Sequence, residues 1–178
     1  MEAIEALCTT LDGAADQALD GVSSLLDKNL LQRTEQEREE PRFLMLETIR
    51  EYAWEALAAN EEAEATRQAH ALYYLGLAEE AEPQLKGAQQ VRWWQRLEQE
   101  LENLRAALSW LIGQEEGELA LRLCAALWWF WNIRGYWSEG WRWLEAVLGL
   151  PQAQARTAKR AKVLHDFLEV SHRLKKEK

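Results

Sequence analysis

The sequence has little proline, glycine or cysteine for its length, with three, nine and two of these among 178 residues. So few chain-breaking residues leave little room for low-complexity linkers. The two cysteines, Cys8 and Cys124, lie far apart, which argues against a disulfide-stapled scaffold and against a zinc site. Free cysteines suit a reducing compartment, so we expect a cytoplasmic protein.

Long apolar runs and a basic leader are missing as well. No run approaches the ~20 apolar residues of a membrane span, so we expect no membrane partner. The N-terminal residues, MEAIEALCTTLDG, are acidic. They lack the basic stretch followed by an apolar core that marks a secretory signal.

Positive charge is scarce except near the C-terminus. The chain carries a net charge of −9, and residues 152–178 contain eight Lys or Arg against three Asp or Glu, so that the remainder carries −14. An acidic body repels nucleic acid and anionic membranes. We interpret the basic segment as a solvated helix face, and we do not expect nucleic acid as a partner.

The first 60 residues have the pattern of part of a winged helix. Residues 14–28 place Leu19 and Val22 on one helical face. The short apolar runs 29–34 and 41–45 flank the polar stretch EQEREE and predict a β-hairpin. An amphipathic helix is expected over 46–60, with an apolar stripe made of Ile49, Tyr52, Ala53, Ala56 and Leu57.

From Asn60 onward the pattern is helical throughout. With Asn60 as a cap, helices are expected over 61–81, 88–112, 117–134, 138–148 and 152–175. The helix over 117–134 is apolar on nearly every side, which is typical of a helix between two layers. The pair 118–148 has the size of the roughly 34-residue tetratricopeptide unit, with Gly140 where close packing needs a small residue. We therefore expect a mainly α fold, with a winged-helix remnant at 1–60 and an α-solenoid of tetratricopeptide-like helix pairs at 61–178.

Tryptophan is abundant, and six of the ten indoles fall within residues 123–143. Helical geometry cannot place all six on one surface, so most of them should pack between helices. One or two are expected in a groove beside arginine, because exposed aromatic and arginine side chains are typical of protein-binding sites. The predicted partner-binding residues are Trp131, Arg134, Tyr136, Trp141 and Arg142.

The sequence contains no recognisable catalytic or metal-binding motif. His70 lies in an amphipathic helix, where packing or capping is the simpler role. His165 and His172 are too far apart along a helix to hold one metal without further ligands. Ser138 lacks the strand and spacing of a nucleophile elbow and fits a helix N-cap better. We expect no enzyme, no cofactor and no metal.

Four phrases resemble the bacterial STAND signal-transduction ATPases, which are regulators related to plant NB-ARC resistance proteins: RFLMLETIREYAWEAL, RQAHALYYLGLAEEAEPQL, ENLRAALSWL and RGYWSEGWRWLEAVL. The resemblance covers about residues 15–150. It implies a nucleotide-binding core followed by a winged helix and tetratricopeptide-like repeats, and therefore that this chain is a fragment of such a protein.

Two departures limit what the resemblance implies. The chain has no Gly-x-x-x-x-Gly-Lys-Ser/Thr loop to cradle phosphates, so it should not bind ATP by itself. In Met45-Leu46-Glu47, Leu46 stands where plant relatives carry a histidine that contacts ADP. Leucine has no donor for a phosphate, so that contact does not carry over.

Three functions follow from this sequence. The first is a non-enzymatic regulatory arm of a STAND protein, coupling a nucleotide switch to a sensing repeat domain. Its partners would be a protein or peptide and the nucleotide-binding core of the full-length protein. The second is a stand-alone peptide-binding helical-repeat scaffold. The third is a winged-helix DNA-binding protein, opposed by Asp16, Asp20 and Asp27 against Lys28 alone in the candidate recognition helix.

Overall fold

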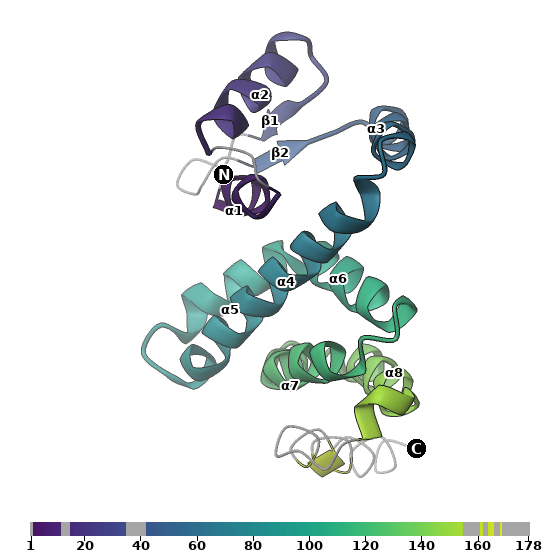
Figure 1. The fold of residues 1–178 in the computed structure, drawn as a ribbon. Helices are drawn as coiled ribbons and strands as arrows, with labels where there is room; N and C mark the ends of the chain where they lie inside the picture. Colours follow the sequence, from purple (N-terminus) through teal and green to yellow (C-terminus); the bar gives the residue numbers. More distant parts are fainter. Residues whose placement is uncertain are drawn as a thin grey trace. The chain divides into compact units, whose positions relative to one another are not determined.

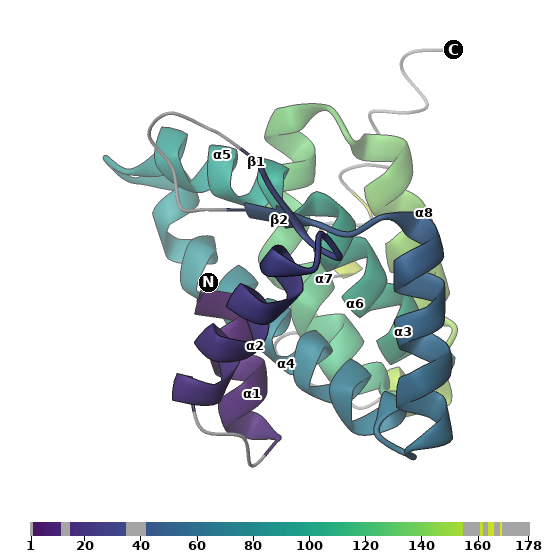
Figure 2. The ribbon, with the colours of Figure 1, turned by 90° about the horizontal axis from the view of Figure 1, so that it is seen from above.

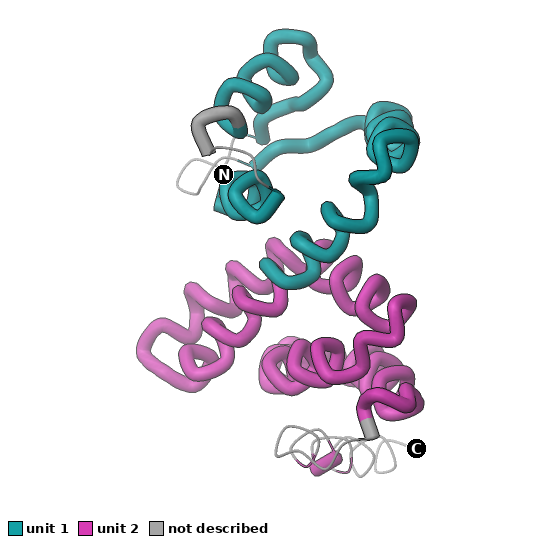
Figure 3. The backbone as a smooth tube through the Cα atoms, viewed as in Figure 1, with its two compact units in different colours: residues 1–73 teal, residues 74–178 magenta. Residues whose placement is uncertain are grey.

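The computed structural model describes residues 2–11, 15–34 and 42–154, together with residues 161, 164, 165 and 168. Two compact units, residues 1–73 and 74–178, divide within helix α4 (Ala63–Ala81) (Figure 3). The described chain is mainly helical with a two-stranded antiparallel hairpin, so the expected fold class is confirmed. The domain boundary at residue 60 and the tetratricopeptide character of the helix pairs stay predictions.

The first unit contains a helix-turn-helix followed by a hairpin. Its elements are α1 (Glu2–Thr10), α2 (Ala15–Asp27), β1 (Gln32–Thr34), β2 (Arg42–Leu44) and α3 (Glu47–Ala59), followed by the start of α4. Helices α1 and α2 pack side by side (Figure 2), and Ala18 and Val22 of α2 are buried. Asn29, with φ 55°, ends α2 in the left-handed conformation that asparagine tolerates better than most residues. The expected helix, hairpin and second helix are confirmed, whereas α1 was not anticipated.

Helix α3 differs from expectation in its burial. None of its residues is buried, and Tyr52 is 70% exposed although the periodicity places it on the apolar face. The other stripe residues, Ile49, Ala53, Ala56 and Leu57, are half-buried, and the guanidinium of Arg67 in α4 lies 4.6 Å from the centroid of the Trp54 ring, so α3 is partly covered. Asn60 lies at the C-terminal end of α3 instead of capping the next helix, because Glu61 adopts φ 61° and α4 begins at Ala63.

The second unit is built around one buried helix. After α4 come η1 (Glu82–Lys86), α5 (Gln90–Gln99), α6 (Leu101–Gly113), α7 (Gly117–Arg134), α8 (Trp137–Leu148) and η2 (Pro151–Gln154). Helix α7 packs against α6, α8, η1 and η2 (Figure 1). Most of α7 is buried, as its nearly all-round apolar pattern predicts.

Three boundaries in this unit differ from expectation. The helix expected over 88–112 is broken at Glu100, whose carboxylate is held by a residue of α4. Helix α8 begins at Trp137, so Ser138 is not its N-cap. The helix expected over 152–175 begins instead with the short 3-10 turn η2, and most of its remaining residues lie outside the described part of the chain. Among the described residues, no helix combines the length and the apolar character needed to cross a membrane.

Candidate functional site

Two of the five predicted partner-binding residues, Arg134 and Tyr136, lie at the turn between α7 and α8. Gly135 adopts φ 78°, a left-handed conformation in which a side chain would be strained, and so ends α7. The Tyr136 N–H donates to the carbonyl of Trp131 at 2.9 Å. The Trp137 indole Nε1 donates to the carbonyl of Asn132 at 2.9 Å. This geometry fixes the directions in which Arg134 and Tyr136 leave the turn.

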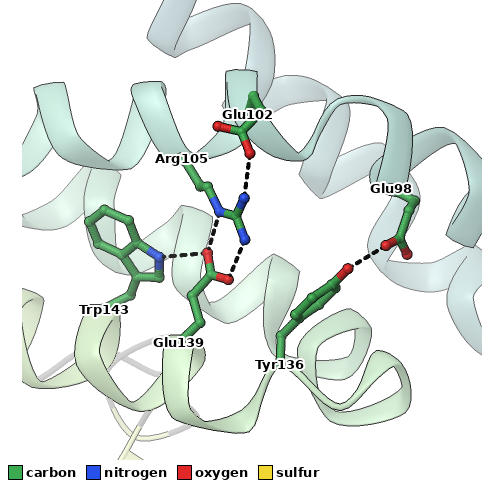
Figure 4. A network of polar contacts seen from close by, with 6 residues as sticks. All are labelled: Glu98, Glu102, Arg105, Tyr136, Glu139 and Trp143. Atoms are coloured by element: carbon green, nitrogen blue, oxygen red, sulfur yellow. Dashed lines mark hydrogen bonds and ion pairs between the residues drawn. The ribbon is translucent and has the colours of Figure 1, made fainter.

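Both Arg134 and Tyr136 bind one carboxylate of α5. Arg134 Nε donates to Glu98 Oε2 at 2.5 Å, and the Tyr136 hydroxyl donates to Glu98 Oε1 (Figure 4). Burial raises the pKa of Glu98, but the hydrogen bonds from Tyr136 and Arg134 outweigh it and leave the pKa below its ordinary value. The same hydrogen bond to Glu98, together with burial, raises the pKa of Tyr136. Glu98 thus ties α5 to the α7–α8 turn.

A second network ties α6 to the first turn of α8. Arg105 donates from Nε and Nη2 to the two oxygens of Glu139, at 2.7 and 2.6 Å, and also pairs with Glu102 (Figure 4). The indole Nε1 of Trp143 donates to Glu139 at 3.3 Å. The hydrogen bonds from Arg105 lower the pKa of Glu139 although burial opposes them. A bidentate pair of this kind sets the orientation of two helices as well as their distance.

The predicted partner-binding residues divide between interior and surface. Trp131 is fully buried, at 1% exposed, and its ring packs against Gly140. Tyr136 and Trp141 are half-buried, whereas Arg134 and Arg142 are exposed. A partner would therefore meet the two arginines and the edges of Tyr136 and Trp141. Their role in binding stays a prediction.

The residues that organise this site were missed by sequence reasoning. Glu98, Arg105 and Glu139 lie on helices whose charged faces have the composition of solvated surface. Arg122 of α7 forms a further bidentate pair with Glu79 of α4 at 2.9 and 2.8 Å. Sequence spacing offers no signal for such pairs, because their partners lie more than 30 residues apart.

The ring of Trp129 in α7 lies beside the cationic side chain of Lys86. The ammonium of Lys86 in η1 lies 4.1 Å from the centroid of the Trp129 ring, within the range of a cation–π contact. Trp128 is buried, and Trp129 is half-buried. Of the six tryptophans within residues 123–143, Trp128 and Trp131 are buried and the other four are half-buried, so full burial is reached by two of them.

The surface of the winged-helix unit mixes acidic and apolar groups. Asp20 and Asp27 of α2 are exposed, and α2 itself contains no lysine or arginine. Two exposed cations follow α2, Lys28 in the turn after the helix and Arg33 in the middle of β1. Large apolar side chains are exposed on the hairpin and α3: Leu44, Leu46 and Tyr52. An exposed group of this kind is typical of an interaction surface.

The histidines and the buried cysteine considered for catalysis differ in their exposure. His70 is half-buried in α4 and His165 is exposed, while His172 lies outside the described residues. Cys124 is fully buried, which raises the pKa of its thiol. Within the described residues, no group of three histidine, cysteine or carboxylate side chains is placed to hold a metal ion.

Comparison with known proteins supports a winged helix in the N-terminal part of the chain. Residues 2–58 match the family described as winged helix-turn-helix domain. The chain is 32% identical over 171 residues to proteins of Mycobacterium bovis and Mycobacterium tuberculosis, each provisionally named an HTH-type transcriptional regulator. The match covers 93% of this chain and 19% of each relative, so the chain spans about a fifth of their length. No solved structure matches. These names count against our expectation that nucleic acid is not a partner.

Proposed function

We propose that this chain is a segment of a transcriptional regulator, in which the winged helix contacts DNA and the helices of unit 2 form a non-enzymatic scaffold for protein contacts. The observation that carries the proposal is the match of residues 2–58 to the winged helix-turn-helix family within a longer similarity to regulators. In such domains the second helix of the helix-turn-helix approaches the major groove. That helix is α2 in this chain.

The charges around α2 define how it would meet DNA. Lysine and arginine are the charged donors to phosphate, and three follow α2: the exposed Lys28 and Arg33, and the half-buried Arg42, which pairs with Thr34 at the loop end of the hairpin. The exposed Asp20 and Asp27 repel phosphate, but carboxylates accept hydrogen bonds from the amino group of cytosine in the major groove. Binding should therefore be weak in total and dependent on few phosphate contacts.

Fluorescence anisotropy with a labelled 20-base-pair duplex of mixed sequence tests this proposal. We expect the chain to bind at ~25 mM salt and to lose most of its affinity at ~150 mM. Lys28→Ala and Arg33→Ala should each weaken binding, because each removes a phosphate contact. Arg92→Ala is the matched control, since Arg92 is an exposed arginine of α5, outside the winged helix. Equal binding by all three variants would place the contact elsewhere.

A second candidate follows from the STAND resemblance: the winged helix docks on a nucleotide-binding core that is not part of this chain. The observation that favours it is the combination of an α2 without cations and the exposed Leu44, Leu46 and Tyr52. Repulsion from phosphate would hinder groove docking, while the apolar group suits a protein partner. In this mechanism, ligand on the repeat domain shifts the packing between winged helix and core.

Amide hydrogen exchange separates the two candidates. If the winged helix docks on a core, the segment corresponding to α3 should exchange more slowly in a full-length mycobacterial relative than in its excised fragment. Equal exchange would count against docking. This candidate requires that the nucleotide site lies on the core and not on the present chain. Micromolar binding of ATP or ADP by the present chain, measured by titration calorimetry, would contradict it.

We also propose that a protein or peptide contacts unit 2 through the exposed Arg134 and Arg142 and the edges of Tyr136 and Trp141. Arginine and aromatic side chains are enriched at such sites. Because Arg134 is already paired with Glu98, an acidic partner would have to compete with that carboxylate. A protein that binds the wild-type chain but not Arg142→Ala would support this contact. A protein that binds both equally would contradict it.

A further inference from the structure

The bend between α5 and α6 has no local cause in the sequence. The two helices meet at one residue, Glu100, with φ −94° and ψ 7°, and continue in different directions (Figure 1). Residues 90–112 contain neither glycine nor proline, and their apolar residues continue the same helical seam across the break. Sharp bends in helices usually trace to proline, to glycine or to an inserted side chain. Neither glycine nor proline marks this break, which leaves the side-chain contacts of Glu100 as its candidate cause.

Glu100 makes that contact. Its Oε2 accepts hydrogen bonds from the hydroxyl of Tyr74 at 3.0 Å and from Nδ2 of Asn103 at 2.6 Å. Tyr74 belongs to α4 and is 4% exposed, whereas Glu100 is half-buried, so the bond between them is partly shielded from water. Asn103 belongs to the first turn of α6. One carboxylate thus joins α4 to the start of α6, at the residue where the helix breaks.

We propose that the hydrogen bonds joining Tyr74 and Asn103 to Glu100, here called the latch, set the angle between α5 and α6. Because Tyr74 lies on α4, the position of α4 then influences that angle. Breaking a helix leaves the first amides of the new helix without partners inside it, which has a free-energy cost. The latch offsets that cost only while Tyr74 stays beside Glu100. Buried leucines hold α6 in the core, and Glu98 holds the end of α5, so loss of the latch changes the bend without detaching either helix.

The position of Tyr74 makes this latch a route for conformational change. Helix α4 begins at Ala63 in the winged-helix unit and reaches Tyr74 without interruption. A rotation of α4 moves the Tyr74 hydroxyl relative to Glu100. The latch then couples the direction of α4 to the angle between two helices of the array, independently of which partner the winged helix binds.

Spin-label distance measurement between Arg92→Cys in α5 and Ser109→Cys in α6, in a Cys8→Ser background, tests the latch. Both labelled positions are exposed, and Cys124 is fully buried. A change of ~20° in the bend moves residue 92, about 12 Å along the helix from residue 100, by roughly 4 Å. We expect one narrow distance distribution in the parent and a broadened or shifted one in Tyr74→Phe and Glu100→Ala.

Two further variants keep the test specific. Glu100→Gln retains an oxygen that accepts from Tyr74 and Asn103, so its distribution should stay narrow. Tyr52→Phe removes an exposed hydroxyl from α3 and should change nothing. A parent-like distribution in Tyr74→Phe would overturn the latch even if that variant unfolds at a lower temperature. A Glu100→Gln distribution as broad as that of Glu100→Ala would overturn the hydrogen-bond mechanism.

Discussion

The ring of Trp131 lies directly against Gly140, so that α7 and α8 approach more closely than a side chain at position 140 would allow. A Cβ there would lie 2.9 Å from Cε3 and 3.2 Å from Cδ2 of Trp131, whose ring is 1% exposed and has no space to move into. The Trp131 ring is therefore a packing group, and it packs against the smallest residue of the next helix.

Gly140→Ala should destabilise the protein. Alanine is favoured over glycine within a helix by up to ~1 kcal/mol. Overpacking against a fixed ring costs about 1–3 kcal/mol, so we expect a net loss of roughly 1 kcal/mol in the free energy of unfolding. Gly76→Ala is the control, because a Cβ at this helical position meets nothing within 4 Å and should stabilise. Urea unfolding measures the free energy of unfolding of both variants. An equal increase in both would show that the Trp131 ring leaves room for a side chain at position 140.

Glu139→Gln should weaken the junction of α6 and α8. The change leaves Arg105 without one charged acceptor in a partly buried pair, which is expected to cost about 2 kcal/mol. Glu145→Gln on the same helix is the control, because Glu145 is exposed and its change should stay within ~0.5 kcal/mol. Thermal unfolding of the two variants measures the difference. Similar melting temperatures would mean that the pair contributes no more than a surface contact.

Acid should abolish the contribution of Glu98 and Glu139. The pKa of each lies below its ordinary value. Burial raises the pKa of Glu98, but hydrogen bonds from Tyr136 and Arg134 outweigh it, and hydrogen bonds from Arg105 lower the pKa of Glu139. Their stabilisation is therefore complete above the ordinary glutamate pKa of ~4.3 and is lost as the pH falls through the lowered values. The stability gap between wild type and the Glu98→Gln, Glu139→Gln double variant should be constant from pH 7 to about 5 and shrink below pH ~4. A gap that persists unchanged to pH 3 would contradict these pKa directions.

The two thiols should differ in reactivity. Cys124 is fully buried in α7 and burial raises the pKa of its thiol, whereas Cys8 on α1 is half-buried. A thiol reagent such as dithionitrobenzoate should therefore modify one cysteine in the native protein and two after unfolding. Cys8→Ser should remove the native reaction. Rapid modification of Cys124 in the folded Cys8→Ser variant would show that α7 opens readily.

The sequence pattern predicts the elements whose bounds depend on neighbouring residues. The bounds of α7 follow from an apolar run between Gly117 and Gly135, and the hairpin follows from two short apolar runs around a charged stretch. The need for a small residue at Gly140 was also foreseen from the packing of a helix pair. These features depend on residues close together in the sequence.

Long-range contacts were beyond such reasoning. The break at Glu100 depends on Tyr74, 26 residues earlier, and no glycine or proline marks it. Arg105 and Glu139 lie 34 residues apart on faces that look solvated. Burial of Trp131 and exposure of Tyr52 likewise depend on which elements pack nearby, which periodicity alone does not specify.

The salt dependence of DNA binding tests the central claim most directly. If Lys28, Arg33 and Arg42 meet three phosphates, a plot of the logarithm of the association constant against that of the salt concentration should have a slope of about −2.7, since each phosphate contact contributes roughly −0.9. Lys28→Ala or Arg33→Ala should each make the slope less negative by about 1. No detectable complex with the duplex at ~25 mM salt would contradict the claim and leave docking on a protein as the function of the winged helix.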